Sequence, residues 1–354
     1  MTAYTLRSDT GAHAEPGHAE RPERLAAVAA RLAAAPVLAA ARLDGRLAQI
    51  EGDASPGALR AALLRVHSAA YLDALDALAA AGGGAADADT YVTPSSPRVA
   101  GEALADLLAC VDAVMTGAAG NAFAIGRPPG HHARPTAAMG FCLYSNAAVA
   151  ARHAQAAHGA ARVLIVDTDV HHGNGTEEAL YDDGTVVFFS SHQAGLYPGT
   201  GALGDTGAGA GRGATVNLPV PAGTDDALVG AYERLLPALA ARVRPDLVIL
   251  SAGFDAHRLD PLGGLALSIA GLADLARVVA RVADEHAGGR LVATLEGGYD
   301  AEAGGGGALA YGATSTLRVL LDRGAEPDDP FGPTRTPGPN LDALVADVAA
   351  RHGL

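Results

Sequence analysis

The segment VLIVDTDVHHGNG, residues 163–175, decides the fold of this 354-residue chain. It opens with four aliphatic residues, and an apolar run of this length before polar residues is typical of a buried β-strand. Because alternate side chains of an extended backbone point to the same side, Asp167, Asp169 and His171 should converge where that strand ends. Two carboxylates and an imidazole in one place favour a divalent metal. Taken alone, the segment also fits a metal-free turn rich in Asp, Gly and Asn.

Three further apolar runs also lead into polar residues. They lie at 122–125, 247–250 and 291–295, and they are followed by His131 and His132, by Asp255 and by Tyr299, respectively. Because such runs alternate with helical segments, we expect βαβ units and a mainly parallel sheet covered on both faces. The carboxyl ends of parallel strands lie on one edge, where ligands bind. All these polar residues should therefore meet at that edge.

Apolar periodicity predicts the remaining elements. Helices are expected over 22–32, 58–81, 99–117, 145–158, 176–182, 226–243, 266–286, 308–322 and 341–352, strands over 163–166 and 186–189 besides those above, and long loops over 82–98, 191–225 and 324–340. No linker separates two cores, so we expect an α/β protein with a single domain over residues 1–354. The Pro-rich loop at 324–340 and the helix at 341–352 should pack on that domain.

The composition excludes several classes of protein. A net charge of −14 argues against sequence-independent binding of nucleic acid, because such binding needs a basic surface. No run of 18 apolar residues occurs, so no contact with a membrane is expected. The N-terminal residues lack an apolar leader, and Cys110 and Cys142 are too few for a disulfide framework. These features predict a cytoplasmic protein.

A set of motifs carries a resemblance to a known family. In chain order they are GHAERPERL (17–25), RPPGHH (127–132), GFCLY (140–144), IVDTDVHHGNGT (165–176), YPGTG (197–201), SAGFD (251–255) and LEGGYD (295–300). Together they resemble the zinc-dependent histone deacetylase family, which includes acetylpolyamine amidohydrolases, and in particular its bacterial, class II-like members. The resemblance extends from about residue 11 to residue 322. It implies an arginase-deacetylase-like three-layer fold around a central, mainly parallel sheet.

The resemblance also implies a metal centre. Matched motif by motif, Asp169, His171 and Asp255 would hold one catalytic Zn²⁺. Three protein ligands leave a coordination position open for water and substrate, which is the catalytic pattern. An O,O,N donor set suits Fe²⁺ as well, so the sequence leaves the metal open.

The remaining catalytic residues follow from the same match. His131 and His132 correspond to the family's tandem histidines, with Asp167 holding the first ring and Asn174 the second. Tyr299 corresponds to the catalytic tyrosine, whose hydroxyl would face the metal across the scissile carbonyl. A neutral Asn174 should favour the imidazolium form of His132 less than a carboxylate would.

The resemblance extends to a substrate tunnel and a potassium site. The tunnel residues would be Gly140, Phe141, Tyr197, Leu262, Gly297 and Gly298, and the K⁺ residues would be Asp167, Asp169, His171, Ser190 and Ser191. Leu262 stands where polyamine-preferring relatives have a glutamate at the tunnel mouth. A neutral mouth favours an acyl-lysine side chain or a small neutral amide over a cationic polyamine. The roles of Asp89 and Arg24 stay open.

The expected function is metal-dependent hydrolysis of the amide of an acylated amine, either an acyl-lysine protein or peptide or a small acetylated amine. Three alternatives remain: an acetylpolyamine deacetylase, an arginase-like ureohydrolase and a non-catalytic protein that binds acylated ligands. A ureohydrolase would need carboxylates for a second metal. Relatives include dimers and tetramers, which leaves a homo-oligomer open.

Overall fold

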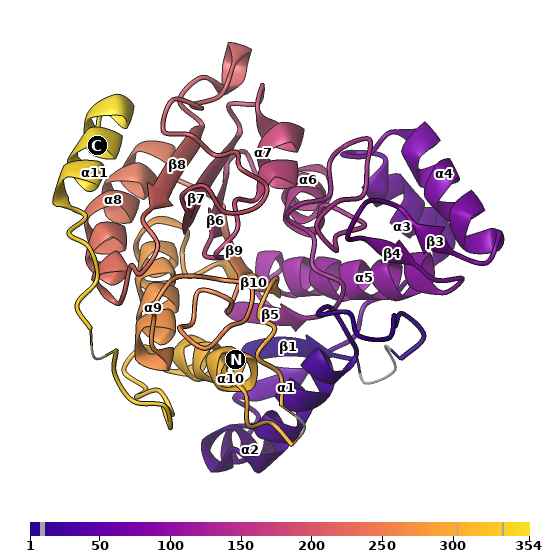
Figure 1. Ribbon diagram of the computed structural model, residues 1–354, viewed down its shortest axis with the longest axis horizontal. Helices are drawn as coiled ribbons and strands as arrows, with labels where there is room; N and C mark the ends of the chain where they lie inside the picture. The colour runs from indigo at the N-terminus through magenta and orange to yellow at the C-terminus, as the bar shows by residue number, and fades with distance from the viewer. Residues whose placement is uncertain (8–10, 303, 335) are drawn as a thin grey trace.

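The fold is built on a parallel β-sheet. The computed structural model describes residues 1–7, 11–302, 304–334 and 336–354 (Figure 1). The sheet strands are β1 (Thr2–Leu6), β2 (Leu47–Gln49), β5 (Asn121–Ile125), β6 (Val163–Asp167), β7 (Val186–Gln193), β8 (Thr215–Val220), β9 (Leu247–Ala252) and β10 (Leu291–Leu295). Within the described residues they form one eight-stranded sheet in the order β2-β1-β5-β10-β9-β6-β7-β8. All neighbouring pairs are parallel, which confirms the predicted α/β class.

Helices cover both faces of this sheet. They are α1 (Glu23–Ala34), α2 (Pro36–Leu43), α3 (Pro56–Leu63), α4 (Ala69–Ala80), α5 (Ser96–Met115), α6 (Asn146–His158), α7 (Asn174–Leu180), α8 (Ala227–Val243), α9 (Ile269–His286), α10 (Ala308–Leu321) and α11 (Asp342–His352), with a short 3₁₀ turn η1 (Gly209–Gly211). Alternate strand residues enter two apolar cores: Val248 and Leu250 of β9 pack with α1 and α8–α11, whereas Leu247 and Ile249 pack with α3–α6. The result is the expected three-layer arrangement.

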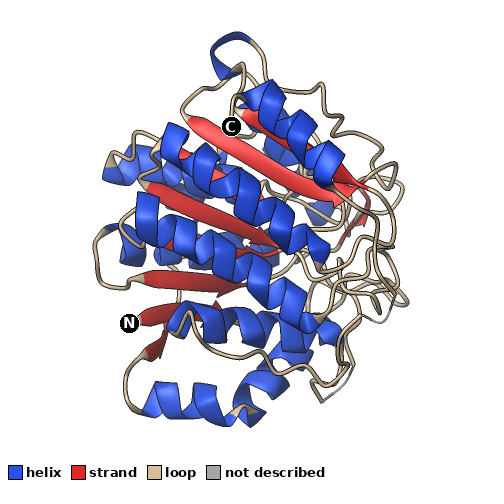
Figure 2. Ribbon diagram, turned by 90° about the vertical axis from the view of Figure 1, so that its left-hand side faces the viewer, coloured by secondary structure: helices blue, strands red, loops and turns tan. Residues whose placement is uncertain are grey.

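The carboxyl ends of the parallel strands lie at one edge of the sheet. In Figure 2 the strand arrows point towards the side of the molecule where most of the long loops gather. In open α/β sheets this edge is the one at which ligands bind. A separate antiparallel pair, β3 (Gly84–Ala85) and β4 (Tyr91–Val92), lies in the loop predicted at 82–98.

Some predicted elements are wrong or were missed. The helix expected over 58–81 is two helices, α3 and α4, because the Ser68 hydroxyl caps α4 and the Ser68 N–H donates to the carbonyl of Pro135. Strands β1 and β2 and helix α2 were not expected. The excursion predicted at 191–225 contains β8, an edge strand paired with β7. The other predicted helices and strands occur within a few residues of their expected bounds.

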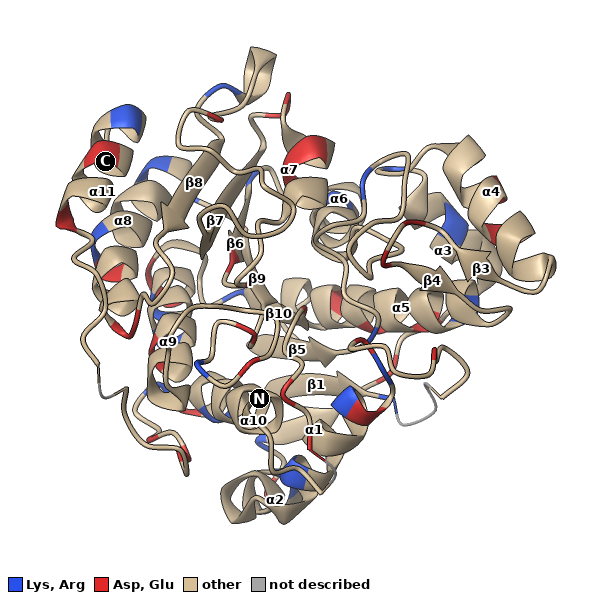
Figure 3. Cartoon of the chain, in the orientation of Figure 1, with Lys and Arg blue, Asp and Glu red and all other residues tan. Residues whose placement is uncertain are grey.

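Two further features of the molecule are the distribution of charged residues and the apolar length of the helices. Figure 3 shows acidic and basic residues intermixed along helices such as α1 and α11. Among the described residues, no single helix has the length and apolar character needed to cross a membrane. The bent pair of α1 and α2, at 74° to each other, passes that test by length and composition alone.

Candidate active site

The predicted metal-binding side chains lie together at the carboxyl edge of the sheet. β6 and β9 are neighbours, with Asp167 paired to Ser251, so the loops that follow these two strands run side by side. One ligand atom each from Asp169, His171 and Asp255 lies within 4.8 Å of the others. Both carboxylates are buried, whereas the imidazole is partly exposed. Asp167 does not join this group, because its carboxylate faces His131 instead.

Backbone donors hold the two carboxylates in place. The N–H of Val170 donates to Oδ1 of Asp255 at 2.9 Å, and the N–H of Gly297 donates to Oδ2 of Asp169 at 2.8 Å. Nδ1 of His171 lies 3.1 Å from Oδ1 of Asp169 and 3.2 Å from Oδ2 of Asp255. Both carboxylates therefore accept backbone N–H groups, Asp169 on both of its oxygens, and each turns an oxygen towards the imidazole.

The pKa shifts of Asp255 and His171 favour binding of a cation by this group. Burial and the nearby Asp169 raise the pKa of Asp255 to about 7. Burial opposes protonation of His171, but the two carboxylates outweigh it and raise the pKa of that ring to about 10. A divalent cation would replace the imidazole proton, because a metal binds only the deprotonated nitrogen. The donor set, two carboxylates and one imidazole, fits Zn²⁺ or Fe²⁺ with a coordination position left open.

Glycines make room for these contacts. A Cβ atom at Gly297 would lie 2.0 Å from Oδ2 of Asp255 and 2.5 Å from Oδ2 of Asp169, so only glycine fits there. A Cβ at Gly253 would lie 2.4 Å from Cα of Asp169. The LEGG and SAG motifs thus have a steric reason: they allow backbone to approach the carboxylates closely.

The tandem histidines lie beside the metal-ligating group and each has the expected partner. Nδ1 of His131 lies 3.1 Å from Oδ2 of Asp167, and Nδ1 of His132 lies 2.7 Å from Oδ1 of Asn174. The Asn174 oxygen can only accept, so Nδ1 of His132 is the donor and Nε2 is left as the basic nitrogen.

The two rings differ in charge. Burial and the imidazoles of His131 and His171 lower the pKa of His132 well below its usual value. For His131, burial also opposes protonation, but the carboxylates of Asp169 and Asp167 outweigh it and raise the pKa well above its usual value. At neutral pH the pair therefore consists of a neutral His132 next to a charged His131. A neutral imidazole with a free Nε2 can accept a proton.

Tyr299 is buried two residues after Gly297, whose N–H donates to Asp169. Its ring packs edge-on against Phe141, with centroids 5.6 Å apart, and the guanidinium of Arg24 lies 4.7 Å above the ring. Burial raises the pKa of Tyr299 well above its usual value, so the hydroxyl keeps its proton and can donate a hydrogen bond. Arg24 also donates to the carbonyls of Gly298 at 2.7 Å and Glu296 at 2.5 Å, which fixes the strand end that carries the tyrosine.

Two of the other predicted tunnel residues, Gly140 and Tyr197, lie beside His132. The ring of Tyr197 lies 5.1 Å from that of His132, and the residue is 37% exposed. Gly140 and Phe141 have φ values of +54° and +69°, and a Cβ at Gly140 would lie 2.4 Å from the His132 ring. Leu262 is partly buried in the loop after Asp255, held by Asp260.

Ser190 and Ser191 lie next to β6 but outside the metal-ligating group. Ser190 pairs with Asp167 across β6 and β7, and its hydroxyl lies 3.0 Å from Nδ1 of His192. The Ser191 hydroxyl lies 2.6 Å from the hydroxyl of Tyr232, which donates to the main-chain oxygen of Asp167 at 3.3 Å. The predicted K⁺ residues are thus neighbours, and K⁺ binding stays a prediction.

Two buried carboxylates support the site although no role was expected for them. Glu296 accepts the N–H groups of Gly130 and His131 at 2.7 and 3.1 Å, and so fixes the start of the histidine pair. Asp260 accepts the N–H of Tyr299 at 2.6 Å and also that of Leu262 at 2.9 Å. One carboxylate thereby links the backbone of Tyr299 to that of Leu262. The only signal for either was its position inside or beside a motif.

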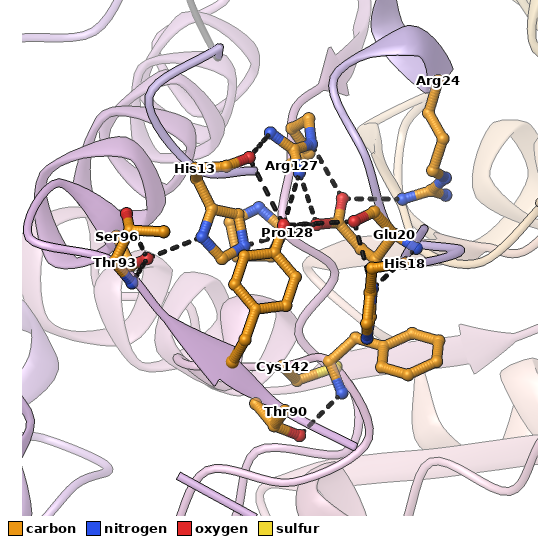
Figure 4. A network of polar contacts seen from close by, with 12 residues as sticks. His13, His18, Glu20, Arg24, Thr90, Thr93, Ser96, Arg127, Pro128 and Cys142 are labelled. Atoms are coloured by element: carbon orange, nitrogen blue, oxygen red, sulfur yellow. Dashed lines mark hydrogen bonds and ion pairs between the residues drawn. The ribbon is translucent and has the colours of Figure 1, made fainter. Parts of the chain in front are cut away.

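A buried ion network joins His13, Glu20 and Arg127 (Figure 4). Glu20 accepts two hydrogen bonds from Arg127, Nε to Oε1 at 2.8 Å and Nη2 to Oε2 at 2.5 Å, and lies 3.3 Å from Nε2 of His13. Burial opposes ionisation of Glu20, but His13 and Arg127 hold the pKa of its carboxyl well below the usual range. The network ties the N-terminal loop to the segment that delivers the tandem histidines.

His18 connects the same loop to Asp89 and Phe141. Its Nε2 lies 3.1 Å from the main-chain oxygen of Asp89, and its ring packs edge-on against Phe141 at 4.6 Å. The N–H of Phe141 donates to the hydroxyl of Thr90 at 3.0 Å (Figure 4). Asp89 is therefore tied through its backbone to the ring that packs on Phe141.

Comparison with known proteins identifies the family. Residues 18–314 match the histone deacetylase domain, so the chain belongs to the histone deacetylase family, whose members are metal-dependent deacetylases, typically with zinc.

Several relatives share much of the chain. The histone deacetylase-like amidohydrolase of Pseudomonas aeruginosa is 41% identical over 286 residues, which is 80% of this chain and 73% of that protein. A probable deacetylase of Archaeoglobus fulgidus is 37% identical over 300 residues, 84% of this chain and 79% of that one. The chloroplastic histone deacetylase 14 of Arabidopsis thaliana is 48% identical over 200 residues, 56% of this chain and 46% of that protein, so the match spans about half of its length.

A solved structure confirms the fold. The crystal structure of the HDA15 HD domain superposes with a TM-score of 0.85 at 36% identity, covering 99% of this chain and 94% of that one.

Proposed function

We propose that the protein is a zinc-dependent amidohydrolase that removes an acyl group from an amine. The observation that carries the proposal is the convergence of Asp169, His171 and Asp255 within 4.8 Å, with the His132 ring 5.9 Å from the His171 ring. The expectation that these residues and Tyr299 act as metal ligands, base and hydrogen-bond donor agrees with membership of the family. The same O,O,N set would hold Fe²⁺, and the metal content of the purified protein decides between the two ions.

The chain supplies the proton transfers. When bound, the metal would polarise the substrate carbonyl and lower the pKa of an attacking water. Nε2 of His132 accepts a proton from that water, because Asn174 holds the opposite ring nitrogen as the donor. The Tyr299 hydroxyl donates to the carbonyl oxygen as negative charge develops there. His132 then returns the proton to the leaving amine, while His131 stays charged through Asp167.

The supporting contacts position these groups. Glu296 holds the backbone before His131, and Asp260 holds the backbone of Tyr299. Because a misplacement of about 1 Å can cost about 10²-fold in rate, such anchors matter as much as the reacting groups. Phe141 and Tyr197 would flank the acyl chain of the substrate, and Gly298, with a φ of +119°, lets the tyrosine turn inward.

An acyl-lysine side chain or a small neutral acetylated amine is the proposed substrate. Leu262 supplies an aliphatic side chain in the mouth loop, where a glutamate would attract a cationic polyamine. We also propose a K⁺ ion beside Asp167 and Ser190, because several oxygens gather there. A second metal, as in a ureohydrolase, has no support from Asn174, which is neutral.

One assay tests the proposal. Release of acetate from an acetyl-lysine peptide and from acetylputrescine is measured side by side, with and without a chelator. The proposal expects metal-dependent turnover with the peptide preferred. A preference for acetylputrescine would favour the acetylpolyamine alternative. Tight binding of the peptide without any turnover would identify a non-catalytic binding protein.

A further inference from the structure

A cluster of potential metal ligands lies away from the candidate active site. Asp112 of α5 and His153 and His158 of α6 each offer one ligand atom, and the three atoms lie within 4.8 Å of one another. Nε2 of both histidines lies 2.6 Å from the same oxygen, Oδ1 of Asp112. The two rings meet edge-on with centroids 5.8 Å apart. Three side chains from two helices thus converge on one point.

The cluster lies at the opposite end of the sheet from the candidate active site. Asp112 is in the last turn of α5, shortly before β5 begins, and His158 ends α6, shortly before β6 begins. Both helices run back across the sheet, so their carboxyl ends lie at the amino ends of the strands. α5 and α6 pack against each other along this face (Figure 1). Chemistry at this cluster is therefore separate from that at Asp169.

The cluster is accessible to solvent, and its carboxyl group favours the ionised form. The side chains of His153 and His158 are each 17% exposed and that of Asp112 is 50% exposed, so an ion can reach them from solvent. Burial opposes ionisation of Asp112, but hydrogen bonds from both histidines lower the pKa of its carboxyl. One carboxylate and two imidazoles are a donor set that suits Zn²⁺ and related ions.

We propose that Asp112, His153 and His158 bind a divalent transition-metal ion of the zinc class, with water in the remaining position. Bonds of about 2.0–2.2 Å in a tetrahedral site place the ligand atoms roughly 3.4 Å apart, so both Nε2–Oδ1 separations must widen by less than about 1 Å. The protons on Nε2 leave or move to Nδ1, as metal binding requires. The bound ion links α5 to α6 and stabilises the folded chain.

The discriminating experiment is equilibrium dialysis of the full chain against buffered micromolar Zn²⁺, followed by metal analysis. We expect two zinc ions per wild-type chain, and one per chain in Asp112→Asn and in His153→Gln. The amide introduced by Asp112→Asn still offers an oxygen to the imidazole N–H groups, so this variant removes the charge with little change in shape. Deacetylation by both variants should equal that of the wild type. One zinc per chain in wild type and variants alike overturns the proposal.

A stability measurement provides an independent readout. In an Asp255→Asn background, where the catalytic site is weakened, Zn²⁺ should still raise Tm, and adding Asp112→Asn should abolish that shift. An equal shift in both proteins contradicts a site at Asp112. The proposal does not depend on the proposed function, because loss of turnover in Asp255→Asn leaves this readout intact.

Discussion

Oδ1 of Asn174 lies 2.7 Å from Nδ1 of His132, so a neutral amide rather than a carboxylate orients the proposed base. Burial and the imidazoles of His131 and His171 lower the pKa of this ring, and the amide adds no negative charge that would oppose them. Replacing the amide by a carboxylate should therefore change the titration of His132 while leaving its orientation intact.

We predict that Asn174→Asp raises the pKa of His132, because an adjacent carboxylate stabilises the imidazolium form. Only the neutral ring accepts a proton, so the acid limb of the pH profile of kcat/KM should move to higher pH by about 1–3 units. The measurement is kcat/KM for an acetyl-lysine peptide across pH in both proteins. An unmoved acid limb, with zinc content unchanged, would exclude His132 as the titrating base.

Tyr299→Phe should lower kcat by about 10²–10³, the usual effect of losing one donor to a developing oxyanion. The change removes one oxygen atom, and the ring contacts with Phe141 and Arg24 remain. Zinc content and thermal stability should therefore stay at wild-type values. Turnover that matches the wild type would rule out the proposed role of the hydroxyl.

Gly297→Ala should weaken zinc binding, since the added Cβ would lie 2.0 Å from Oδ2 of Asp255. Overpacking of this kind costs about 1–3 kcal/mol, which corresponds to roughly 5- to 150-fold in affinity. The measurement is the zinc dissociation constant by competition with a chromophoric chelator. Gly57→Ala is the matched control, because a Cβ there meets no atom within 4 Å. Equal affinities in the two variants would contradict the steric argument.

His67 should make stability depend on pH. Its ring is buried, its Nε2 accepts the N–H of Ser145 at 2.9 Å, and burial lowers its pKa to about 4. The pKa of His67 in the folded state lies below its unfolded value of about 6.5. The neutral ring therefore contributes its full stabilisation of the fold above about pH 6.5, and this stabilisation is lost as pH falls towards 4.

The titration of His67 alone should lower the free energy of unfolding by about 3 kcal/mol between pH 7 and pH 4. His67→Gln keeps a donor and an acceptor but does not titrate, so its free energy of unfolding should fall less over the same range. Urea titrations at several pH values give the comparison. Other buried groups, such as Glu20, contribute equally in both proteins, and parallel curves would show that His67 plays no part.

The sequence was sufficient for the strands that carry the site. β6, β9 and β10 are apolar runs that stop where polar residues begin, so both the strands and their common edge could be predicted. β1 and β8 could not, although they are as long, because polar residues such as Thr5 and Asn217 interrupt their apolar pattern and become buried only when the sheet assembles. The break between α3 and α4 depends on a bond from Ser68 to Pro135, far along the chain.

The residues of the candidate site likewise fall into those that the sequence predicts and those that it does not. Asp169, His171 and Asp255 could be proposed from strand ends and motifs, and their positions agree with that expectation. Glu296 and Asp260 could not be assigned, because their partners are backbone N–H groups of distant segments. Spacing along the chain carries no signal for such contacts. The contrast between a neutral His132 and a charged His131 also depends on burial and neighbours that only the fold supplies.

The most direct test is a zinc titration of metal-free protein with acetate release as the readout. In the His153→Gln/His158→Gln double variant, which lacks the second proposed site, the account predicts no turnover without metal. Activity should rise linearly and level off at one zinc per chain, and Asp255→Asn should stay inactive throughout. Full turnover by the metal-free protein, or a rise that does not require Asp255, would contradict the account.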